Sequence, residues 1–439
     1  MLFENCLVTN SICAPSRAVI LTGKHSHVNG VRDNRVEFNA HQQTFPKLLQ
    51  QAGYQTALIG KWHLKSEPIG FDYFDILPGQ GQYYNPDFIN AEGRYRVEGY
   101  CTDIITEKAV DWLEDRNEDE PFMLMVQHKA PHRQWQPAPR HFSLFKNDVP
   151  EPVDLFDDWQ NRNSGAAAQE MSIKEYLRHE YDLKIGKAPQ RLNEQQKKLW
   201  DAYYQPHNQW FAAANLAGDA LTRYYYQRYI KDYLRCVQAV DDGIGDLLDT
   251  LAEQGMDENT IVIYASDQGF YLGDYGWYDK RWMYEPSLKT PLVVKWPGVT
   301  KPGSRNENIV LNLDFAQTFL EMAQTKQPSD MQGRSLVPLL AGKDVNDWRR
   351  SMYYHYFELG EHNVPRHFGV RTDRFKLIRY YDLDEWELFD LQTDPREKMN
   401  LYDNVAYRSI RSRMMRLLEA ERLAAGDADA HSVAAYVGQ

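Results

Sequence analysis

The 439-residue sequence lacks several features that would assign it to a simple functional class. It has no run of about 18 apolar residues, so it predicts no transmembrane helix. Its 50 Lys and Arg against 62 Asp and Glu give a net charge of −12, which leaves no basic face for nucleic acid. Its four cysteines have neither zinc-finger spacing nor the density of a disulfide framework. The composition predicts a globular chain long enough for one large domain or two.

The most informative segment is Cys13-Ala14-Pro15-Ser16-Arg17, which Leu21-Thr22-Gly23 follows. Pro15 suits the first turn of a helix, where its missing N–H costs nothing, and Gly23 suits the left-handed residue that ends one. Cys13 is therefore expected at a helix N-terminus, where free N–H groups and the helix dipole favour negative charge. Arg17 lies one turn later, with a planar fork that suits a tetrahedral oxyanion.

This segment resembles the defining motif of the type I sulfatases, which belong to the alkaline phosphatase superfamily. The resemblance implies that Cys13 is oxidised to formylglycine by a formylglycine-generating or anaerobic sulfatase-maturing enzyme. The hydrated aldehyde then attacks the sulfur of a sulfate ester. The alternative is that Cys13 is a small buried apolar side chain, which is the usual role of a free cysteine.

Two further segments carry basic side chains at the ends of predicted strands. Gly60-Lys61-Trp62-His63-Leu64 follows a strand at 55–59, and in an extended chain Lys61 and His63 point to the same side. The segment resembles a sulfatase motif, which implies that Lys61 binds sulfate and His63 orients the nucleophile. Ala130-Pro131-His132 resembles another, in which His132 contacts sulfate and protonates the leaving oxygen. His128 is the alternative acid.

Ser266-Asp267-Gln268-Gly269 closes a predicted strand at 260–265. A carboxylate and an amide at a strand end offer oxygen ligands to a hard divalent cation, although a simple Asx turn has the same composition. The resemblance implies that Asp267 and Gln268, together with the residue formed from Cys13, bind Ca²⁺ or alternatively Mg²⁺. It also implies that Lys280 is a second sulfate-binding lysine and that Arg17 helps to neutralise the sulfate.

The predicted fold is α/β, with a large, mostly parallel mixed sheet between helices. Helices are expected at 44–52, 103–115 and 235–254, and strands at 55–59, 121–126, 260–265 and 291–294. Asp241 and Asp242 fall inside the third helix and face different directions, so we expect them on its surface. Residues 133–225 interrupt the alternation of strands and helices and are interpreted as a long insertion that shapes the substrate cleft.

From about residue 350 the pattern changes to short alternating strands, which are followed by an amphipathic helix at 407–424. This predicts a smaller antiparallel sheet with a packing helix. We therefore divide the chain into a catalytic unit at 1–345 and a C-terminal unit at 346–439.

The sequence departs from the resemblance at its beginning. Sulfatases of this type start with an apolar strand that ends in paired aspartates, which complete the metal site. Here only twelve residues precede Cys13, and Glu4 is the only acid among them. We therefore expect the catalytic unit to be N-terminally truncated, and this exact chain to bind its cation weakly and to be poorly active. No signal peptide is recognised, so export to the periplasm or secretion is implied by the resemblance alone.

The expected reaction is the hydrolysis of sulfate esters on a glycosaminoglycan or mucin-type glycan. Residues 81–88 and 29–34 resemble bacterial glycan sulfatases, most closely the N-acetylglucosamine-6-sulfatase group. Arg366 and His367 are candidates for a sugar subsite. Two alternatives remain: a phosphodiesterase or phosphonate hydrolase of the same superfamily, and an inactive glycan-binding protein.

Overall fold

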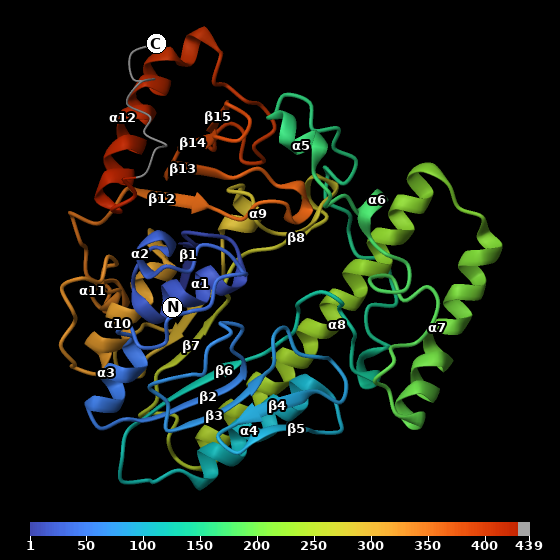
Figure 1. Cartoon of the computed structure of the whole chain (residues 1–439), viewed down its shortest axis with the longest axis vertical. Coiled ribbons are helices and arrows are strands. Elements are labelled where there is room, and N and C mark those ends of the chain that lie inside the picture. The colour runs from blue at the N-terminus through green and yellow to red at the C-terminus, as the bar shows by residue number, and fades with distance from the viewer. Residues whose placement is uncertain (429–439) are drawn as a thin grey trace.

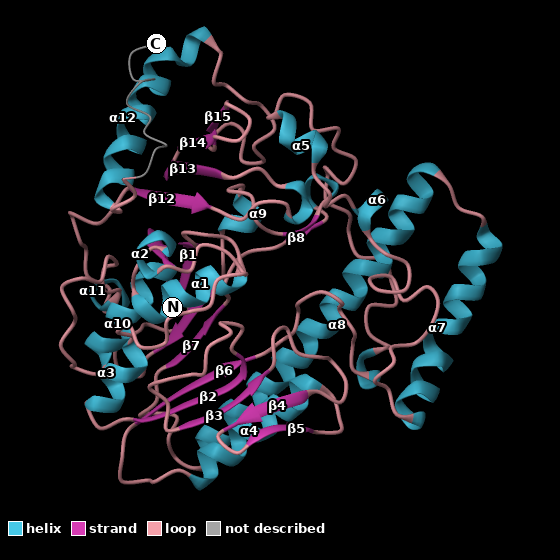
Figure 2. Cartoon of the chain, viewed as in Figure 1, coloured by secondary structure: helices cyan, strands magenta, loops and turns pink. Residues whose placement is uncertain are grey.

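The computed structural model describes residues 1–428, so residues 429–439, at the end of the predicted C-terminal unit, lie outside the described residues. Strands gather into a lower pair of sheets and an upper sheet, and two long helices extend to one side (Figures 1 and 2). Among the described residues, no helix combines the length and the apolar character needed to cross a membrane.

Two sheets build the catalytic part. The first has the order β11-β1-β10-β7, formed by Arg305–Leu311, Leu2–Leu7, Leu292–Lys295 and Val262–Ala265. The second has the order β5-β4-β3-β2-β6, formed by Gly93–Arg96, Asp87–Asn90, Tyr73–Leu77, Gln55–Lys61 and Phe122–Gln127. Of the pairs within them, β1–β11, β2–β3 and β2–β6 are parallel and the others are antiparallel.

Helices cover both faces of the second sheet. On one face, α4 (Cys101–Asp115) contributes Ile104 and Ile105 to a cluster with Ile59 of β2. On the other, α1 (Cys13–Thr22), α3 (Phe45–Gln51) and α10 (Phe315–Met322) pack against Leu58 and Ile76. The continuous apolar run along β2, which places Leu58 on one face and Ile59 on the other, therefore favours a helix–sheet–helix arrangement. The short helices α2, α9 and α11 span Ser26–Asn29, Glu285–Leu288 and Val337–Leu340.

The predicted insertion contains α5 (Ser164–Ala168), α6 (Ile173–Tyr176) and α7 (Glu194–Ala214). The long helix α8 (Gly218–Glu253) follows and runs back to the sheet, where it packs on α4 (Figure 1). Aromatic side chains fill the contact between the insertion and α8, and Trp135, Tyr204 and Tyr229 are completely buried there.

The C-terminal sheet is antiparallel, with the order β12-β13-β14-β15 formed by Ser351–Tyr356, His367–Thr372, Phe375–Tyr380 and Glu385–Asp390. Helix α12 (Arg408–Ala424) packs on it through Met414, Met415 and Leu418. A two-stranded ribbon, β8 (Tyr271–Leu272) and β9 (Tyr278–Asp279), links the catalytic sheets to this region. One-turn 3₁₀ helices lie at Pro139–His141, Asp274–Gly276, Asn312–Asp314, Glu361–Asn363 and Val405–Tyr407.

The expected α/β class, with helices on both faces and a separate antiparallel sheet, is confirmed. The strand directions are more mixed than expected. The described strands of the catalytic part form two separate sheets instead of one, and β6 and β7 are end strands of these sheets. Short connections between β3, β4 and β5 cannot hold a crossover helix, so these strands pair antiparallel. The boundary at residue 345 stays a prediction.

Candidate active site

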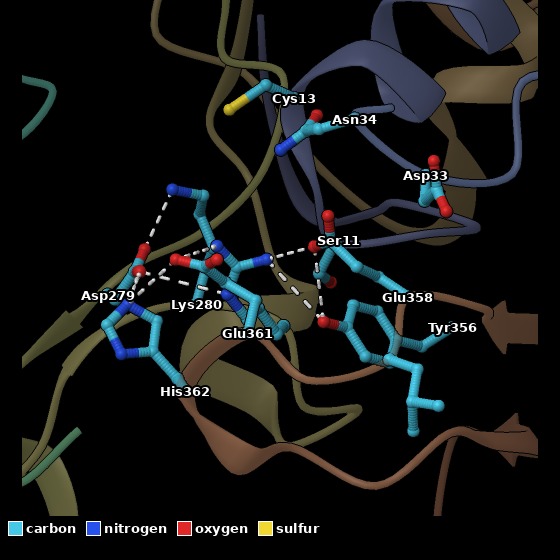
Figure 3. A network of polar contacts seen from close by, with 12 residues as sticks. Ser11, Cys13, Asp33, Asn34, Asp279, Lys280, Tyr356, Glu358, Glu361 and His362 are labelled. Carbon is cyan, nitrogen blue, oxygen red and sulfur yellow. Dashed lines mark hydrogen bonds and ion pairs between the residues drawn. The ribbon is translucent and has the colours of Figure 1, made fainter. Parts of the chain in front are cut away.

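The predicted helix after Cys13 forms as the sequence indicated. Helix α1 begins at Cys13, and Gly23 ends it with φ 63° while its N–H bonds the carbonyl of Val19. The Cys13 side chain is 1 % exposed. Asn34 accepts a hydrogen bond from the Ala14 N–H at 3.0 Å, which fixes the first turn beside the loop that carries Asn34 (Figure 3).

The loop after β7 brings Asp267 and Gln268 to this helix end. The Gln268 amide lies 3.9 Å from the Cys13 sulfur, and its Oε1 is buried with no partner among the described residues. A side chain at Gly269 would place its Cβ 2.2 Å from the Pro286 carbonyl oxygen, so only glycine lets the loop pack this closely. The Ser16 hydroxyl donates to the Asp267 carbonyl and ties the loop to α1.

Arg17 connects three segments of the site. Its Nε donates to Asp267 at 3.0 Å, and its Nη1 donates to the Lys61 carbonyl and to Gln127 Oε1, both at 2.5 Å. The guanidinium thus holds α1 against the ends of β2 and β6 and gives a positive charge to the site from a fixed position. Although burial raises the pKa of Asp267, Arg17, Lys61 and Lys280 together bring it below the usual value.

Lys61 is the last residue of β2 and is 2 % exposed. Gly60 precedes it with φ 103°, and a Cβ there would lie 2.1 Å from the Gln127 carbonyl oxygen of β6. Among residues 1–428 no ion pair or hydrogen bond is found for the Lys61 ammonium. Burial lowers its pKa, and the nearby Arg17 and Lys280 act in the same direction.

His63 lies beyond the strand with φ 60°, so the expectation of an extended chain from Lys61 to His63 does not hold. The turn nevertheless leaves His63 close to the site, because Lys61, Arg17, Asp267 and Lys280 all act on it. Burial, followed by the positive charges of Lys61, Arg17 and Lys280, lowers the pKa of His63 to about 2. The buried Nδ1 of His63 has no partner in the described part of the chain.

His132 and His128 follow β6. His132 Nδ1 lies 2.6 Å from the carbonyl oxygen of Arg133, so this nitrogen carries the proton and Nε2 is left as the acceptor. Burial and then Lys61, Lys280 and Lys129 hold the pKa of His132 well below its usual value. Both nitrogens of His128 are buried without a described partner, and burial lowers its pKa to about 4.

The sequence analysis missed Lys129. Its side chain is 5 % exposed, and its ammonium lies 4.8 Å over the ring of Tyr83. Within residues 1–428, the one hydrogen bond found for this ammonium is a 3.5 Å contact with the Arg133 carbonyl. Burial, followed by the charge of Lys61, lowers its pKa to about 7. The available signal was its position beside Ala130-Pro131-His132, although a lysine at a strand end is usually solvated.

Lys280 is 4 % exposed, and its ammonium lies 2.7 Å from the Asp279 carboxylate, on the side of the network that faces Cys13 (Figure 3). Burial lowers its pKa, but Asp279 and Cys13 outweigh burial and raise it overall. The second oxygen of Asp279 lies 2.8 Å from His362 Nε2, and the adjacent Arg281 pairs with Glu358 at 2.5 Å. Asp279, Arg281 and His362 were also missed, since His362 is 83 residues from Asp279 in sequence.

The cluster around Cys13 contains more positive than negative charge. Its basic side chains are Arg17, Lys61, Lys129 and Lys280. The three lysines are buried, the Arg17 side chain is 13 % exposed, and Lys129, whose pKa is about 7, is only partly charged at neutral pH. Its carboxylates are Asp267 and Asp279. Buried charges are normally paired, so this excess favours an anion as the missing partner.

The side chains beside Cys13 include the type of oxygen ligand that a hard divalent cation requires. Asp267 and Gln268 place a carboxylate and an unpartnered amide oxygen beside Cys13, and oxygen ligands are what such ions require. Within residues 1–428, no group of three or more His, Cys, Asp and Glu side chains is arranged to hold a metal ion.

Four expected residues lie outside the cluster. Arg366 is paired with Asp382 at 2.6 Å. His367 is completely buried, and its two ring nitrogens contact the Pro365 carbonyl at 2.8 Å and the Met283 N–H at 3.1 Å, so it offers no ring nitrogen to a sugar. Asp242 contacts His141 at 2.8 Å and Asp241 contacts Gln238, as expected for residues on a helix surface.

Comparisons with known proteins identify the family of the chain. The family model named Sulfatase matches residues 1–325, and the model named N-sulphoglucosamine sulphohydrolase, C-terminal, matches residues 273–424. The chain is 49 % identical to an N-acetylglucosamine-6-O-sulfatase of Bacteroides thetaiotaomicron, over 95 % of this chain and 79 % of the relative. It is 28 % identical to a human N-acetylglucosamine-6-sulfatase, over 81 % of this chain and 61 % of the relative.

Solved structures extend the likeness. A structure described as a complex with its substrate D-glucosamine-2-N,6-O-disulfate has a TM-score of 0.96 and 47 % identity, and the match covers 98 % of this chain and 91 % of that chain. A phosphonate monoester hydrolase of Agrobacterium radiobacter has a TM-score of 0.68 and 17 % identity, over 97 % of this chain and 88 % of the other. The second likeness is one of fold alone.

Proposed function

The chain belongs to the sulfatase family, whose members are sulfuric ester hydrolases, and we propose that it removes a 6-O-sulfate from a glucosamine-type sugar of a sulfated glycan. The observation that carries the proposal is the excess of buried cations around Cys13. A sulfate ester supplies the negative charge that this cluster lacks, and the charge that grows on the sulfate oxygens during bond cleavage meets fixed positive groups.

We assign the two lysines to the sulfate. The Lys61 ammonium has no described partner, so it is available to an anion without first breaking an ion pair. Lys280 keeps Asp279 as a partner and donates its remaining protons toward Cys13. Arg17 keeps the predicted role of helping to neutralise the sulfate, and its bonds to Asp267, Lys61 and Gln127 support a positioning role as well.

The two histidines have different tasks. Burial and the nearby cations lower the pKa of His63 to about 2, so it stays neutral at physiological pH and is a weak base. Its unpartnered Nδ1 therefore suits a group that orients the nucleophile through a hydrogen bond. Without a bound anion, burial and the positive charges of Lys61, Lys280 and Lys129 keep His132 neutral. Bound sulfate offsets their charge and raises the pKa of His132, so Nε2 can hold the proton that the leaving oxygen receives.

We infer that residue 13 is converted to formylglycine by a maturing enzyme, and that Asp267 and Gln268 hold a divalent cation, with calcium as our choice. When formed, the aldehyde hydrate supplies a nucleophile, and the cation supplies Lewis-acid stabilisation of the sulfate oxygens. Ser16 holds the helix that carries residue 13 against the loop that carries Asp267 and Gln268. Its hydroxyl donates a hydrogen bond to the Asp267 carbonyl and accepts one from the Asn312 amide at 2.8 Å.

The sugar assignment is supported by the 49 % identical relative and by polar groups beside Lys280. Asp279, His362 and the 56 % exposed Glu361 offer acceptors and donors next to the lysine that binds sulfate (Figure 3). The carboxylates accept hydrogen bonds from sugar hydroxyls, and the imidazole can donate or accept one. The two carboxylates would repel a second negative group of the substrate at this position.

The test is production of the chain together with a formylglycine-generating enzyme. Modification lowers the mass of the Cys13 peptide by about 18 Da. Turnover of N-acetylglucosamine 6-sulfate by the modified chain would support the proposal and would contradict the expectation of a poorly active chain. Cys13→Ala is expected to lower kcat by about 10⁴-fold. Turnover by a modified chain that prefers an aryl phosphodiester to an aryl sulfate would instead favour the phosphodiesterase alternative, and a modified, folded chain that hydrolyses neither would favour a binding protein.

A further inference from the structure

A second cationic cluster lies at the hairpin of β4 and β5. Three arginines converge on the single carboxylate of Asp87: Arg94 at 2.6 Å, Arg96 at 2.8 Å and Arg191 at 2.9 Å. These hydrogen bonds, led by that of Arg191, hold the pKa of Asp87 well below its usual value, so the carboxylate stays ionised. One negative charge thus faces three positive charges.

The arginines remain accessible. The Arg94 and Arg96 side chains are each 60 % exposed, and the Arg191 side chain is 27 % exposed. Arg94 and Arg96 are two residues apart on β5, so their guanidinium groups leave the same face of the strand. A shallow surface hollow is lined by Asp87, Arg94, Tyr95 and Arg96. The chain has a net charge of −12, whereas this patch of three arginines and one aspartate has a net positive charge.

Strand register relates this cluster to the candidate active site. Lys61 of β2 is opposite Leu77 of β3, and Ile76 is opposite Ile89 of β4, so Asp87 lies one residue beyond the level of Leu77. Arg96 is opposite Asp87. The cluster and Lys61 therefore share the edge of the sheet that holds the carboxyl end of β2. Three strand spacings separate β2 from β5, which is about 14 Å.

We propose that Arg94, Arg96 and Arg191 form a subsite for a second anionic group, a sulfate or carboxylate, on a glycan whose terminal 6-sulfate is bound at Lys61. This inference rests on the proposed function. Arginine suits the role because its planar fork bonds both oxygens of such a group. Asp87 holds the forks in place without cancelling their charge. The substrate class is thereby narrowed to glycans that carry more than one acidic group.

The experiment compares a short and a long substrate. The double variant R94A/R96A is measured against R223A/R305A, in which two exposed arginines, each paired with one glutamate, are removed elsewhere. The substrates are N-acetylglucosamine 6-sulfate and a heparin tetrasaccharide with a 6-sulfate on its terminal sugar. We expect R94A/R96A to lower kcat/KM for the tetrasaccharide about ten-fold through KM, and to leave the monosaccharide unchanged. R223A/R305A should change neither.

A binding measurement separates this inference from the proposed function. In a Cys13→Ala background, calorimetry should show a roughly ten-fold weaker tetrasaccharide affinity for R94A/R96A, with a difference that shrinks as NaCl is raised. The subsite would be overturned if R94A/R96A bound the tetrasaccharide as tightly as its parent, or if the affinity for the monosaccharide fell as much as the affinity for the tetrasaccharide. Absence of sulfatase turnover with every sugar would overturn the function and leave the binding result to stand alone. If the double variant does not fold, R94Q serves in its place.

Discussion

Two buried ionic clusters in this chain have different charge balances. Around Cys13, four basic side chains face two carboxylates. Behind the C-terminal sheet, two cations face two carboxylates: the Lys376 ammonium contacts Glu397 at 2.5 Å and Glu285 at 2.8 Å, and Arg371 contacts Glu285 at 3.1 Å. Both Lys376 and Glu397 are completely inaccessible to solvent.

The difference separates a structural role from a functional one. In the C-terminal cluster every buried charge has its partner within the chain, so the folded state leaves no anion or cation to be supplied. In the Cys13 cluster the chain lacks negative charge. An uncompensated buried cation costs free energy, which is recovered when an anion binds or when the group loses its proton. The unbalanced cluster is therefore the one that we assign to substrate.

The largest effect should come from unbalancing the balanced cluster. Lys376→Met leaves Glu285 and Glu397 facing one another with only Arg371 beside them, so we expect a loss of about 3–5 kcal/mol in the free energy of unfolding. Denaturant unfolding measures it. The double variant Lys376→Met/Glu397→Gln removes one charge of each sign and should recover most of the loss. A single variant as stable as the wild type would contradict the pairing argument.

The opposite response is expected at the active site. Lys61→Met removes one excess cation, so kcat/KM for N-acetylglucosamine 6-sulfate should fall by about 10²–10³-fold while the melting temperature stays constant or rises. Lys295→Met, on an exposed position of β10, is the matched control and should change neither quantity. If Lys61→Met destabilised the chain as Lys376→Met does, the distinction between the two clusters would fail.

Local features of the site were predictable from sequence because they depend on short segments. Pro15 and Gly23 bound α1, and the apolar residues before Lys61 and before Ser266 identify strands whose ends carry polar groups. The expected residues Cys13, Lys61, His132 and Lys280 lie together, although the elements that carry them belong to different sheets. Their catalytic roles remain predictions.

The features of the site that the sequence did not predict depend on contacts between segments far apart in the chain. His362 reaches Asp279 only because a loop of the C-terminal region folds over β9, and no local pattern of sequence encodes that approach. Arg366 and His367 were expected at a sugar subsite from their place before a predicted strand. Arg366 pairs with Asp382 and His367 is completely buried, and their role in sugar binding stays a prediction. The truncation expected from the motif comparison also stays a prediction.

His362 sharpens the comparison, because it links the active-site cluster to the C-terminal region. Its Nε2 lies 2.8 Å from Asp279, which in turn holds Lys280. His362→Ala should lower kcat/KM about ten-fold by releasing Asp279 to move with Lys280. His362→Gln, which keeps an N–H donor, should restore part of the activity. Equal losses in both variants, or loss of stability without loss of kcat/KM, would indicate that the contact serves folding alone.

Lys129 gives the smallest effect and the most direct measure of the charge excess. Its pKa of about 7 in the folded chain lies below the value of about 10.4 in an unfolded one, so between these values the unfolded state binds the extra proton. Stability from this group therefore rises as pH increases from 7 to 10. The penalty is fully present below pH 7 and disappears above about pH 10.4. Lys129→Met should raise the melting temperature by a few degrees at pH 6 and leave it unchanged near pH 10. A difference between variant and wild type that does not vary with pH would show that Lys129 remains charged, and that a carboxylate or bound anion balances it in the folded protein.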